Sequence, residues 1–311
     1  MNVYYGLENI EIHNAVATIG SFDGVHKGHR TVLENLNKLA KKLGGSSVVI
    51  TFYPHPREVL YPNERPPGLL NTLKEKESLL SSLGIDNLVV LKFTRELSNL
   101  TYQEFMSKIL INSIGIKALV VGYDHRFGKN REGDFDSLKL LSKKYGFYLE
   151  QEKVYEENKI NISSTKIRKA VIQGNIKVAN DFLGYNYSIS GTVVNGRSLG
   201  RKLGFPTANI DLEDHRKLLP AVGVYAVKVE VNNQRYSGML NIGYRPTVSR
   251  SGIMSLEVNI FDFDDEIYDH NIQVSVFDRV RGEKRFCGVA DLIAELTKDR
   301  DIVRNLLIGI K

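Results

Sequence analysis

The chain of 311 residues is about twice the length of a typical domain of ~150 residues, which predicts two domains. Hydrophobic residues make up 42% of it and charged residues 25%, a globular balance that excludes a mainly disordered protein. Lys plus Arg number 42 against 36 for Asp plus Glu, and this net charge of +6 is spread along the chain. It suits anionic ligands but lacks the basic runs of a nucleic-acid-binding tail.

Cysteine content and hydropathy exclude further classes of protein. Cys287 is the single cysteine of the sequence, which excludes an intramolecular disulfide and a cysteine-based zinc site. We expect it to be a small buried residue beside the tail helix rather than a nucleophile. No apolar run approaches the ~18 residues of a membrane span. Met1–Ile12 carries Glu8 and Glu11 and lacks a basic region, so we expect no signal peptide and a cytoplasmic protein.

The first half alternates predicted strands and helices. This order predicts a parallel sheet with helices on its faces, and ligands in such sheets bind at the carboxyl ends of the strands. The predicted elements are strand Ala15–Gly20, a helix carrying Val32 to Leu43, strand Ser47–Phe52, helix Leu73–Leu83, strand Asn87–Leu91, helix Thr101–Ile114 and strand Lys117–Gly122.

The pattern changes near Gly184–Tyr187. Two short helices come before this point, and closely spaced strands follow it, which predicts a small antiparallel barrel or sandwich. Asn232 and Asn233 predict a tight hairpin turn, because Asn tolerates positive φ. The predicted elements are helices Thr165–Gln173 and Ile176–Leu183, strands Tyr187–Val194, Gly223–Val231, Gln234–Ile242, Ser255–Phe261 and Gln273–Asp278, and a helical tail from Val289.

A histidine motif lies between the first predicted strand and the first helix. In the sequence Gly20–His29 (GSFDGVHKGH), Gly24 permits a tight turn and Gly28 lets a ligand approach the backbone closely. His26 and His29 fall on one face at the helix start. Free N–H groups and the helix dipole attract phosphate there, and two imidazoles can donate hydrogen bonds to a phosphoryl group as it gains charge. The alternative is two ordinary surface histidines. A metal site is disfavoured because the sequence shows no third ligand nearby.

Two further segments lie where a nucleotide could reach them. Ile162–Arg168 (ISSTKIR) offers Ser164 or Thr165 as a helix N-cap, with Arg168 one turn in, and could hold a polyphosphate. Gly122–Gly128 (GYDHRFG) directly follows a predicted buried strand. The alternatives are a plain capped helix and a charged surface loop.

Together these segments resemble the adenylyltransferase half of the bacterial bifunctional riboflavin kinase/FMN adenylyltransferase family, also called FAD synthetase. The resemblance implies a Rossmann-like domain in which the phosphate of FMN attacks the α-phosphorus of ATP and releases pyrophosphate. It implies that His26 and His29 stabilise the transferring phosphate, while Ser164, Thr165 and Arg168 hold pyrophosphate. The family usually has Phe where this chain has His125. The implied nucleotide-binding residues are Gly20, Phe22, Asp23, Gly24, Gly28, Asp124, Ser163, Ser164 and Thr165.

A glycine-rich loop opens the second half. Gly200–Asn209 (GRKLGFPTAN) allows close backbone approach to an anion, and Arg201 adds charge. Thr207 and Asn209 share a face of an extended segment, and their neutral oxygens suit Mg²⁺ that carries nucleotide phosphates. The alternative is a Gly-rich connector between strands.

Glu257 lies in an alternating segment, Ser255–Phe261, on the face opposite Leu256 and Val258. A carboxylate there could take the proton of an attacking alcohol, which is a poor nucleophile at neutral pH. The alternative is a solvated strand residue.

These segments resemble the riboflavin kinase half of the same family, so the resemblance covers nearly the whole chain. It rests on GRKLGFPTANI, NIGYRPTV at Asn241–Val248, LEVNIFDF at Leu256–Phe263 and the tail after Arg281. It implies a six-stranded barrel that phosphorylates the ribityl 5′-hydroxyl of riboflavin. It also implies that Gly200, Arg201 and Gly204 bind nucleotide, that Thr207 and Asn209 bind Mg²⁺ and phosphate, and that Glu257 is the base. Asn259 and Asp269 depart from the family pattern, which commonly has His and Gly there.

We therefore expect an α/β plus β protein: a Rossmann-like nucleotidyltransferase domain with a parallel sheet, then a small antiparallel barrel with a terminal helix. The predicted domains are 1–184, an FMN adenylyltransferase, and 185–311, a riboflavin kinase. The expected ligands are ATP with Mg²⁺, riboflavin, FMN and FAD, with no nucleic acid or membrane, and a monomer is possible. One alternative keeps the kinase beside a regulatory N-terminal domain, and another is a basic, flavin-responsive nucleic-acid-binding protein.

Overall fold

The structure is a computed structural model that describes residues 1–64, 66–123, 125–152, 156–157, 160–196, 199–244 and 254–310. The chain divides into two compact units, Met1–Ser164 and Thr165–Lys311. Within the described stretches, no helix is both long and apolar enough to cross a membrane.

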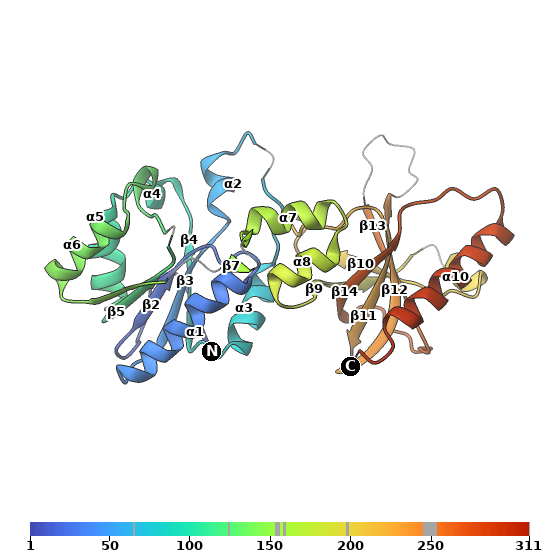
Figure 1. Ribbon diagram of the computed structural model, residues 1–311, viewed down its shortest axis with the longest axis horizontal. Coiled ribbons are helices and arrows are strands. Elements are labelled where there is room, and N and C mark those ends of the chain that lie inside the picture. The colour runs from blue at the N-terminus through green and yellow to red at the C-terminus, as the bar shows by residue number, and fades with distance from the viewer. Residues whose placement is uncertain are drawn as a thin grey trace. The chain divides into compact units, whose positions relative to one another are not determined.

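The first unit is built on a parallel sheet (Figure 1). Across its described residues six strands hydrogen bond in the order β1-β4-β3-β2-β5-β6, and each neighbouring pair is parallel. The predicted parallel sheet is confirmed. The strands are β1 (Asn2–Tyr5), β2 (Val16–Ile19), β3 (Ser47–Tyr53), β4 (Asn87–Lys92), β5 (Ala118–Val121) and β6 (Tyr148–Gln151).

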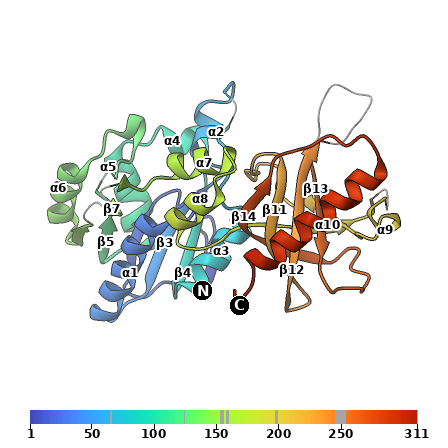
Figure 2. The ribbon, with the colours of Figure 1, turned by 45° about the vertical axis from the view of Figure 1, so that its right-hand side comes forward.

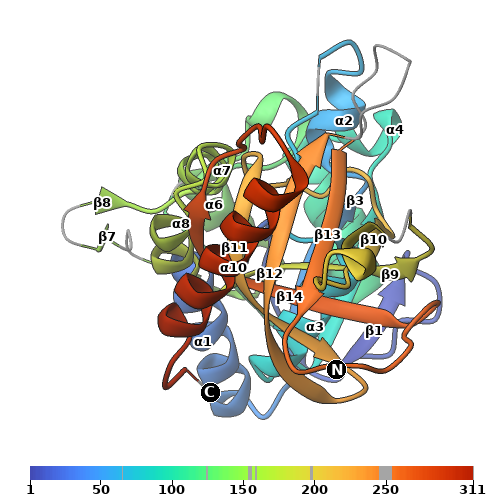
Figure 3. The same cartoon turned by 90° about the vertical axis from the view of Figure 1, so that its right-hand side faces the viewer.

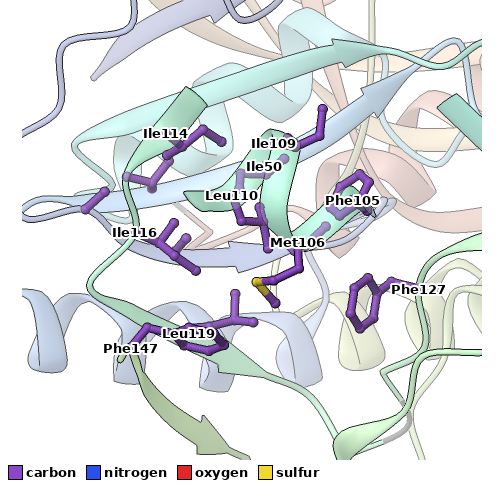
Figure 4. Packing of buried hydrophobic residues seen from close by; sticks show 14 of the residues in the cluster. Ile50, Phe105, Met106, Ile109, Leu110, Ile114, Ile116, Leu119, Phe127 and Phe147 are labelled. Carbon is purple, nitrogen blue, oxygen red and sulfur yellow. The ribbon is translucent and has the colours of Figure 1, made fainter. Parts of the chain in front are cut away.

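Alternate residues of the central strands feed two hydrophobic cores, one on each face of the sheet. Val49, for example, packs with Leu33 and Leu36 of α1, whereas its neighbour Ile50 packs with Met106 and Leu110. Figure 4 shows this second core, in which the side chains of η1 lie against the sheet. The helices of the unit are α1 (Lys27–Lys42), α2 (Pro56–Leu60), α3 (Leu73–Ser82), α4 (Arg95–Ser98), α5 (Tyr102–Glu104), the π-helix η1 (Phe105–Ile114), the 3₁₀ turn η2 (Lys129–Arg131) and α6 (Phe135–Tyr145).

The second unit begins with two helices, α7 (Ser164–Ile172) and α8 (Ile176–Leu183), which end at left-handed Gly174 and Gly184 as the sequence predicts. A closed barrel follows, and within the described residues its strands run in the order β10-β13-β12-β11-β14-β9 with antiparallel pairing throughout (Figure 3). The strands are β9 (Tyr187–Val194), β10 (Ala208–Leu212), β11 (Gly223–Val231), β12 (Gln234–Tyr244), β13 (Met254–Ile260) and β14 (Asn271–Arg281). The second unit also contains a short helix, α9 (Leu199–Lys202). The first unit contains in addition an antiparallel hairpin of β7 (Glu156–Glu157) and β8 (Ile160–Asn161).

The terminal helix α10 (Val289–Leu306) covers the outer face of the barrel (Figure 2). Val303 and Leu307 pack with Ala226 and Met239, which alternate with the fully buried Tyr225 and Leu240 that pair across β11 and β12. The inside of the barrel is thus filled by one set of alternate residues, and the helix buries part of the other set.

The helix α8 packs against barrel residues of its own unit. The Asn180 side chain donates to the Val276 carbonyl (2.9 Å) and accepts from the backbone N–H of Tyr187 (2.7 Å). Lys177 pairs with Asp278 at 2.8 Å. The predicted division of activities at residues 184 and 185 stays a prediction, because packing does not say which reaction this helix serves.

Local predictions met different outcomes. Asn232 and Asn233 have φ of 51° and 62°, which confirms the hairpin turn. Cys287 is exposed, so its expected burial is wrong: it lies in the loop before α10 rather than on the packed face of that helix.

Candidate functional site

The first site is the turn between β2 and α1. Phe22 and Val25 are buried and have φ of 44° and 35°, and Gly24 between them has φ of 91°. Positive φ is costly for a β-branched residue such as Val, so neighbouring contacts must hold this turn in place. Gly20 precedes it, and an added Cβ there would lie 3.1 Å from the Phe22 ring.

The two histidines lie against each other at the start of α1. Their ring centroids are 3.6 Å apart with an interplanar angle of 14°, and the Phe22 ring meets His29 edge-on at 5.1 Å. His26 is the N-cap, and its Nδ1 accepts the backbone N–H of His29 at 3.3 Å. Because Nδ1 accepts, the neutral ring of His26 carries its proton on Nε2. Gly28 is the second residue of the helix.

The environment keeps His29 uncharged. Burial lowers the pKa of His29 well below its usual value, and the electrostatic effects of His26 and Lys76 lower it further. Its Nδ1 is buried and has no hydrogen-bond partner within the part of the chain that the structure describes. The pair therefore presents polar N–H groups beside the positive end of a 16-residue helix, a suitable arrangement for a phosphate.

Asp23 joins this turn to the segment before α3. Its carboxylate, 2% exposed, accepts the backbone N–H groups of Leu70 (3.0 Å) and Asn71 (3.2 Å). Its carbonyl accepts the Ser164 hydroxyl at 2.8 Å. A nucleotide contact by Asp23 stays a prediction, and its observed contacts are with the protein itself.

A small pocket opens beside the turn, past the carboxyl ends of β2 and β3. Of the residues that line this pocket, only Asp23 is a site residue predicted from the sequence. The others could have been sought after β3, because ligands of parallel sheets bind at the carboxyl ends of the strands. The lining residues are Asp23, Phe52, Tyr53, His55, Leu69, Asn71, Leu73 and Lys76.

The remaining predicted residues of this half lie in two places. Asp124 lies outside the described residues, and the neighbouring His125 ring stacks on Phe127 at 5.7 Å. Ser163 is half-buried, and Ser164 begins α7. Thr165 is exposed and Arg168 half-buried, but both belong to the second unit, so their assembly with the histidine pair stays a prediction.

The second site lies on the outer face of the barrel. Asn209 of β10 is paired with Glu257 of β13, which is also paired with Asn241 of β12. Side chains of directly paired residues lie on the same face of a sheet, so the register brings these three polar groups together. Asn259 lies on that face too, and its amide donates to the Pro206 carbonyl at 2.6 Å.

Two glycines approach the predicted magnesium ligands closely. A Cβ on Gly196 would lie 2.0 Å from the amide nitrogen of Asn209, and one on Gly200 would lie 2.2 Å from the Phe205 carbonyl and 3.2 Å from the Thr207 hydroxyl. Because Gly196 and Gly200 have no Cβ, there is room for the side chains of Thr207 and Asn209, which are half-buried. Their neutral oxygens fit Mg²⁺, which is coordinated by oxygen and commonly keeps water and phosphate ligands.

The other predicted residues of this loop are placed as follows. Arg201 and Gly204 are exposed, and Gly204 has φ of 79°, which favours glycine. Of the NIGYRPTV segment, residues 245–248 lie outside the described part of the chain.

Comparison with known proteins places both halves. Residues 8–166 match the FAD synthetase family model, and residues 183–307 match the riboflavin kinase model. The bifunctional riboflavin kinase/FMN adenylyltransferase of Pseudomonas fluorescens is 37% identical over 98% of both chains. Its namesake in Escherichia coli K12 is 38% identical over 98% of this chain and 97% of its own.

A solved structure agrees in fold. A protein of Streptococcus pneumoniae, described as a macrolide-efflux protein, superposes with a TM-score of 0.88 at 33% identity, over 98% of this chain and 99% of its own. With both family models in order and relatives matched over nearly their full lengths, the chain belongs to the bifunctional riboflavin kinase/FMN adenylyltransferase family.

Proposed function

We propose that the two sites divide two consecutive reactions: the barrel unit phosphorylates riboflavin to FMN with ATP, and the first unit transfers the adenylyl group of a second ATP to FMN. In the second reaction an oxygen of the FMN phosphate bonds to the α-phosphorus of ATP. The bond from that phosphorus to the β-phosphate oxygen breaks, and pyrophosphate leaves. The nucleophile is already an anion, so this site needs charge stabilisation rather than a base.

The stacked histidine pair at the start of α1 is the observation that carries this assignment. His26 carries its proton on Nε2, His29 is held uncharged, and the N-terminus of α1 lies beside them. These donors suit an α-phosphate whose charge grows during the displacement. Ser164, Thr165 and Arg168 complete the proposal as the residues that hold the departing pyrophosphate.

The kinase reaction needs a different group. The ribityl 5′-hydroxyl oxygen attacks the γ-phosphorus of ATP, its proton passes to Glu257, and ADP leaves. Glu257 is half-buried and directly paired with Asn209, so a carboxylate lies beside the nucleotide loop where a base is required. Mg²⁺, held by Thr207 and Asn209, would neutralise charge on the phosphates of ATP.

Incubating the protein with riboflavin, ATP and Mg²⁺, and separating the flavins by chromatography, tests the proposal. We expect FMN to appear first and FAD after it, and both to require Mg²⁺. FMN without FAD, also when FMN is supplied, would instead support a regulatory first unit. A steep salt dependence of binding to generic RNA would favour the nucleic-acid alternative.

The cellular setting belongs to the same proposal. A cytoplasmic location and small-molecule partners without nucleic acid are supported by the single cysteine and the diffuse charge of the sequence.

A further inference from the structure

Lys76 of α3 is a buried lysine that the sequence analysis did not single out. It is 8% exposed, although lysine is almost never fully buried without a partner. Its ammonium group donates to the backbone carbonyl of Ser21 at 2.7 Å and lies 3.5 Å from the hydroxyl oxygen of Thr51. Burial lowers the pKa of Lys76, and the nearby carboxylates of Asp23 and Glu77 oppose this effect.

The Ser21 carbonyl is held from two sides. Besides Lys76, it accepts the hydroxyl of Thr51, which is fully buried in β3, at 3.2 Å. Ser21 directly precedes Phe22, the first residue of the turn with positive φ. A strained turn persists when its surroundings fix it, and these two donors hold the point where the strain begins.

Ser21 is connected to the two histidines through contacts between aromatic rings. Phe22 follows Ser21 in the chain, and its ring meets His29 edge-on at 5.1 Å. His29 in turn stacks on His26 at 3.6 Å. A shift of the Ser21 carbonyl would therefore move Phe22, and the two imidazole rings would no longer be held in their present orientation.

We propose that Lys76 is a positioning residue for adenylyl transfer: by holding the Ser21 carbonyl it fixes the turn, the Phe22 ring and hence the His29 ring. The inference rests on the proposed role of the histidine pair. Its effect is expected in the rate of the chemical step, because a displacement of about 1 Å can cost about 10²-fold in rate.

Lys76→Met tests this, because it keeps most of the length of the side chain and removes the charge and the donor. Its control is Lys74→Met, a change of an exposed lysine two residues earlier in the same helix. FAD formation from supplied FMN gives kcat and KM for each substrate. NMR of selectively labelled histidine, with the His29 signal assigned by its loss in His29→Ala, reports the ring environment directly.

We expect kcat to fall about 10- to 100-fold in folded Lys76→Met, with KM for ATP and FMN within about threefold and a shifted His29 signal. Lys74→Met should behave as the wild type. A rate within twofold of the wild type, a reduced kcat with an unmoved His29 signal, or a change confined to KM would each overturn the proposal. The last would mean that Lys76 contacts substrate.

Thr51→Val is the second variant, which decides the question if Lys76→Met does not fold. It removes one of the two donors to Ser21 at nearly constant volume, so we expect the same changes at a smaller size. Unchanged kcat together with an unmoved His29 signal would contradict the proposal. If His29→Ala makes FAD at nearly the wild-type rate, the proposed function of the histidine pair has failed, and this inference with it. If FAD formation is strongly reduced in His29→Ala but Lys76→Met keeps nearly the wild-type rate, the inference alone has failed.

Discussion

The turn around His26 and the strand pair around Glu257 are both proposed to act on ATP, but they are built from different groups. The first gathers neutral imidazoles and helix N–H groups, and its carboxylate, Asp23, is occupied by backbone N–H groups. The second brings a half-buried carboxylate beside Asn209. The two sites differ because their nucleophiles differ: the phosphate of FMN is already an anion, whereas a sugar hydroxyl must lose a proton.

Glu257→Gln removes the base and should give the largest effect. We expect FMN formation from riboflavin to slow by about 10²–10⁴-fold, the usual worth of general-base catalysis, while flavin fluorescence still reports binding. FAD formation from supplied FMN should stay unchanged. A variant that binds both ligands and phosphorylates at nearly the wild-type rate would show that Glu257 is a solvated strand residue.

His29→Ala tests the other side of the comparison. Losing one preorganised donor should reduce FAD formation by about 10²–10³-fold, while FMN accumulates from riboflavin at the normal rate. Chromatography of the flavins over time measures both steps in one reaction. Equal loss of both products in a folded protein would disprove the division of labour.

Gly196→Ala should separate activity from stability in the barrel. The added methyl group would meet the flexible amide of Asn209, which can rotate away, so the fold is kept and the ligand is displaced. We expect kinase activity to fall about tenfold or more with a nearly unchanged melting temperature. Gly288→Ala, where a Cβ meets nothing within 4 Å, is the matched control. Full kinase activity in Gly196→Ala would remove Asn209 from the site.

Arg168→Lys keeps the charge and loses the planar fork that suits phosphate oxygens. Losing one hydrogen bond to a charged group predicts a decrease of about tenfold in FAD synthesis, with a higher KM for ATP. Steady-state kinetics at varied ATP measure it, with the kinase reaction as the unaffected control. Unchanged ATP kinetics would place Arg168 outside the site.

The pH dependence of stability gives the smallest expected effect. The pKa of His29 is lower in the fold than its usual value of 6.5, so below this pH the unfolded chain binds a proton that the folded chain does not. Stability is therefore complete above pH 6.5 and decreases as the pH falls, by at most about 1.4 kcal/mol per pH unit. Hydrogen exchange of α1 amides at pH 7.5 and 5.5, corrected for intrinsic exchange rates, should show this loss, and His29→Gln should reduce it. An equal loss of stability between pH 7.5 and 5.5 in the wild type and in His29→Gln would contradict this role of His29.

Sequence reasoning reached the features that are local in the chain. The histidine turn, the two glycine-terminated helices and the Asn232–Asn233 hairpin follow from neighbouring residues, and the structure places them where they were predicted. The edge strands β1 and β6 were missed because they are short and partly exposed, without the continuous apolar run of a central strand.

Contacts between distant residues were beyond the reach of sequence patterns. Lys76 lies 55 positions from Ser21 and Asn71 lies 48 from Asp23, and no spacing in the chain predicts these contacts. The helix predicted over Thr101–Ile114 is a short α-helix followed by a π-helix, and Phe105, Met106, Ile109 and Leu110 of the π-helix lie in the core. The spacing of these apolar residues predicts a helix but does not distinguish the α form from the π form.

The central claim is that two independent sites act in sequence, and mixing two variants tests it most directly. His29→Ala should make FMN but very little FAD from riboflavin, and Glu257→Gln should make little of either, although it converts supplied FMN. Mixed in equal amounts with riboflavin, ATP and Mg²⁺, they should form FAD, because FMN released by one protein is adenylylated by the other. Failure of the mixture to form FAD, when Glu257→Gln alone converts FMN at the concentration that accumulates, would contradict the account.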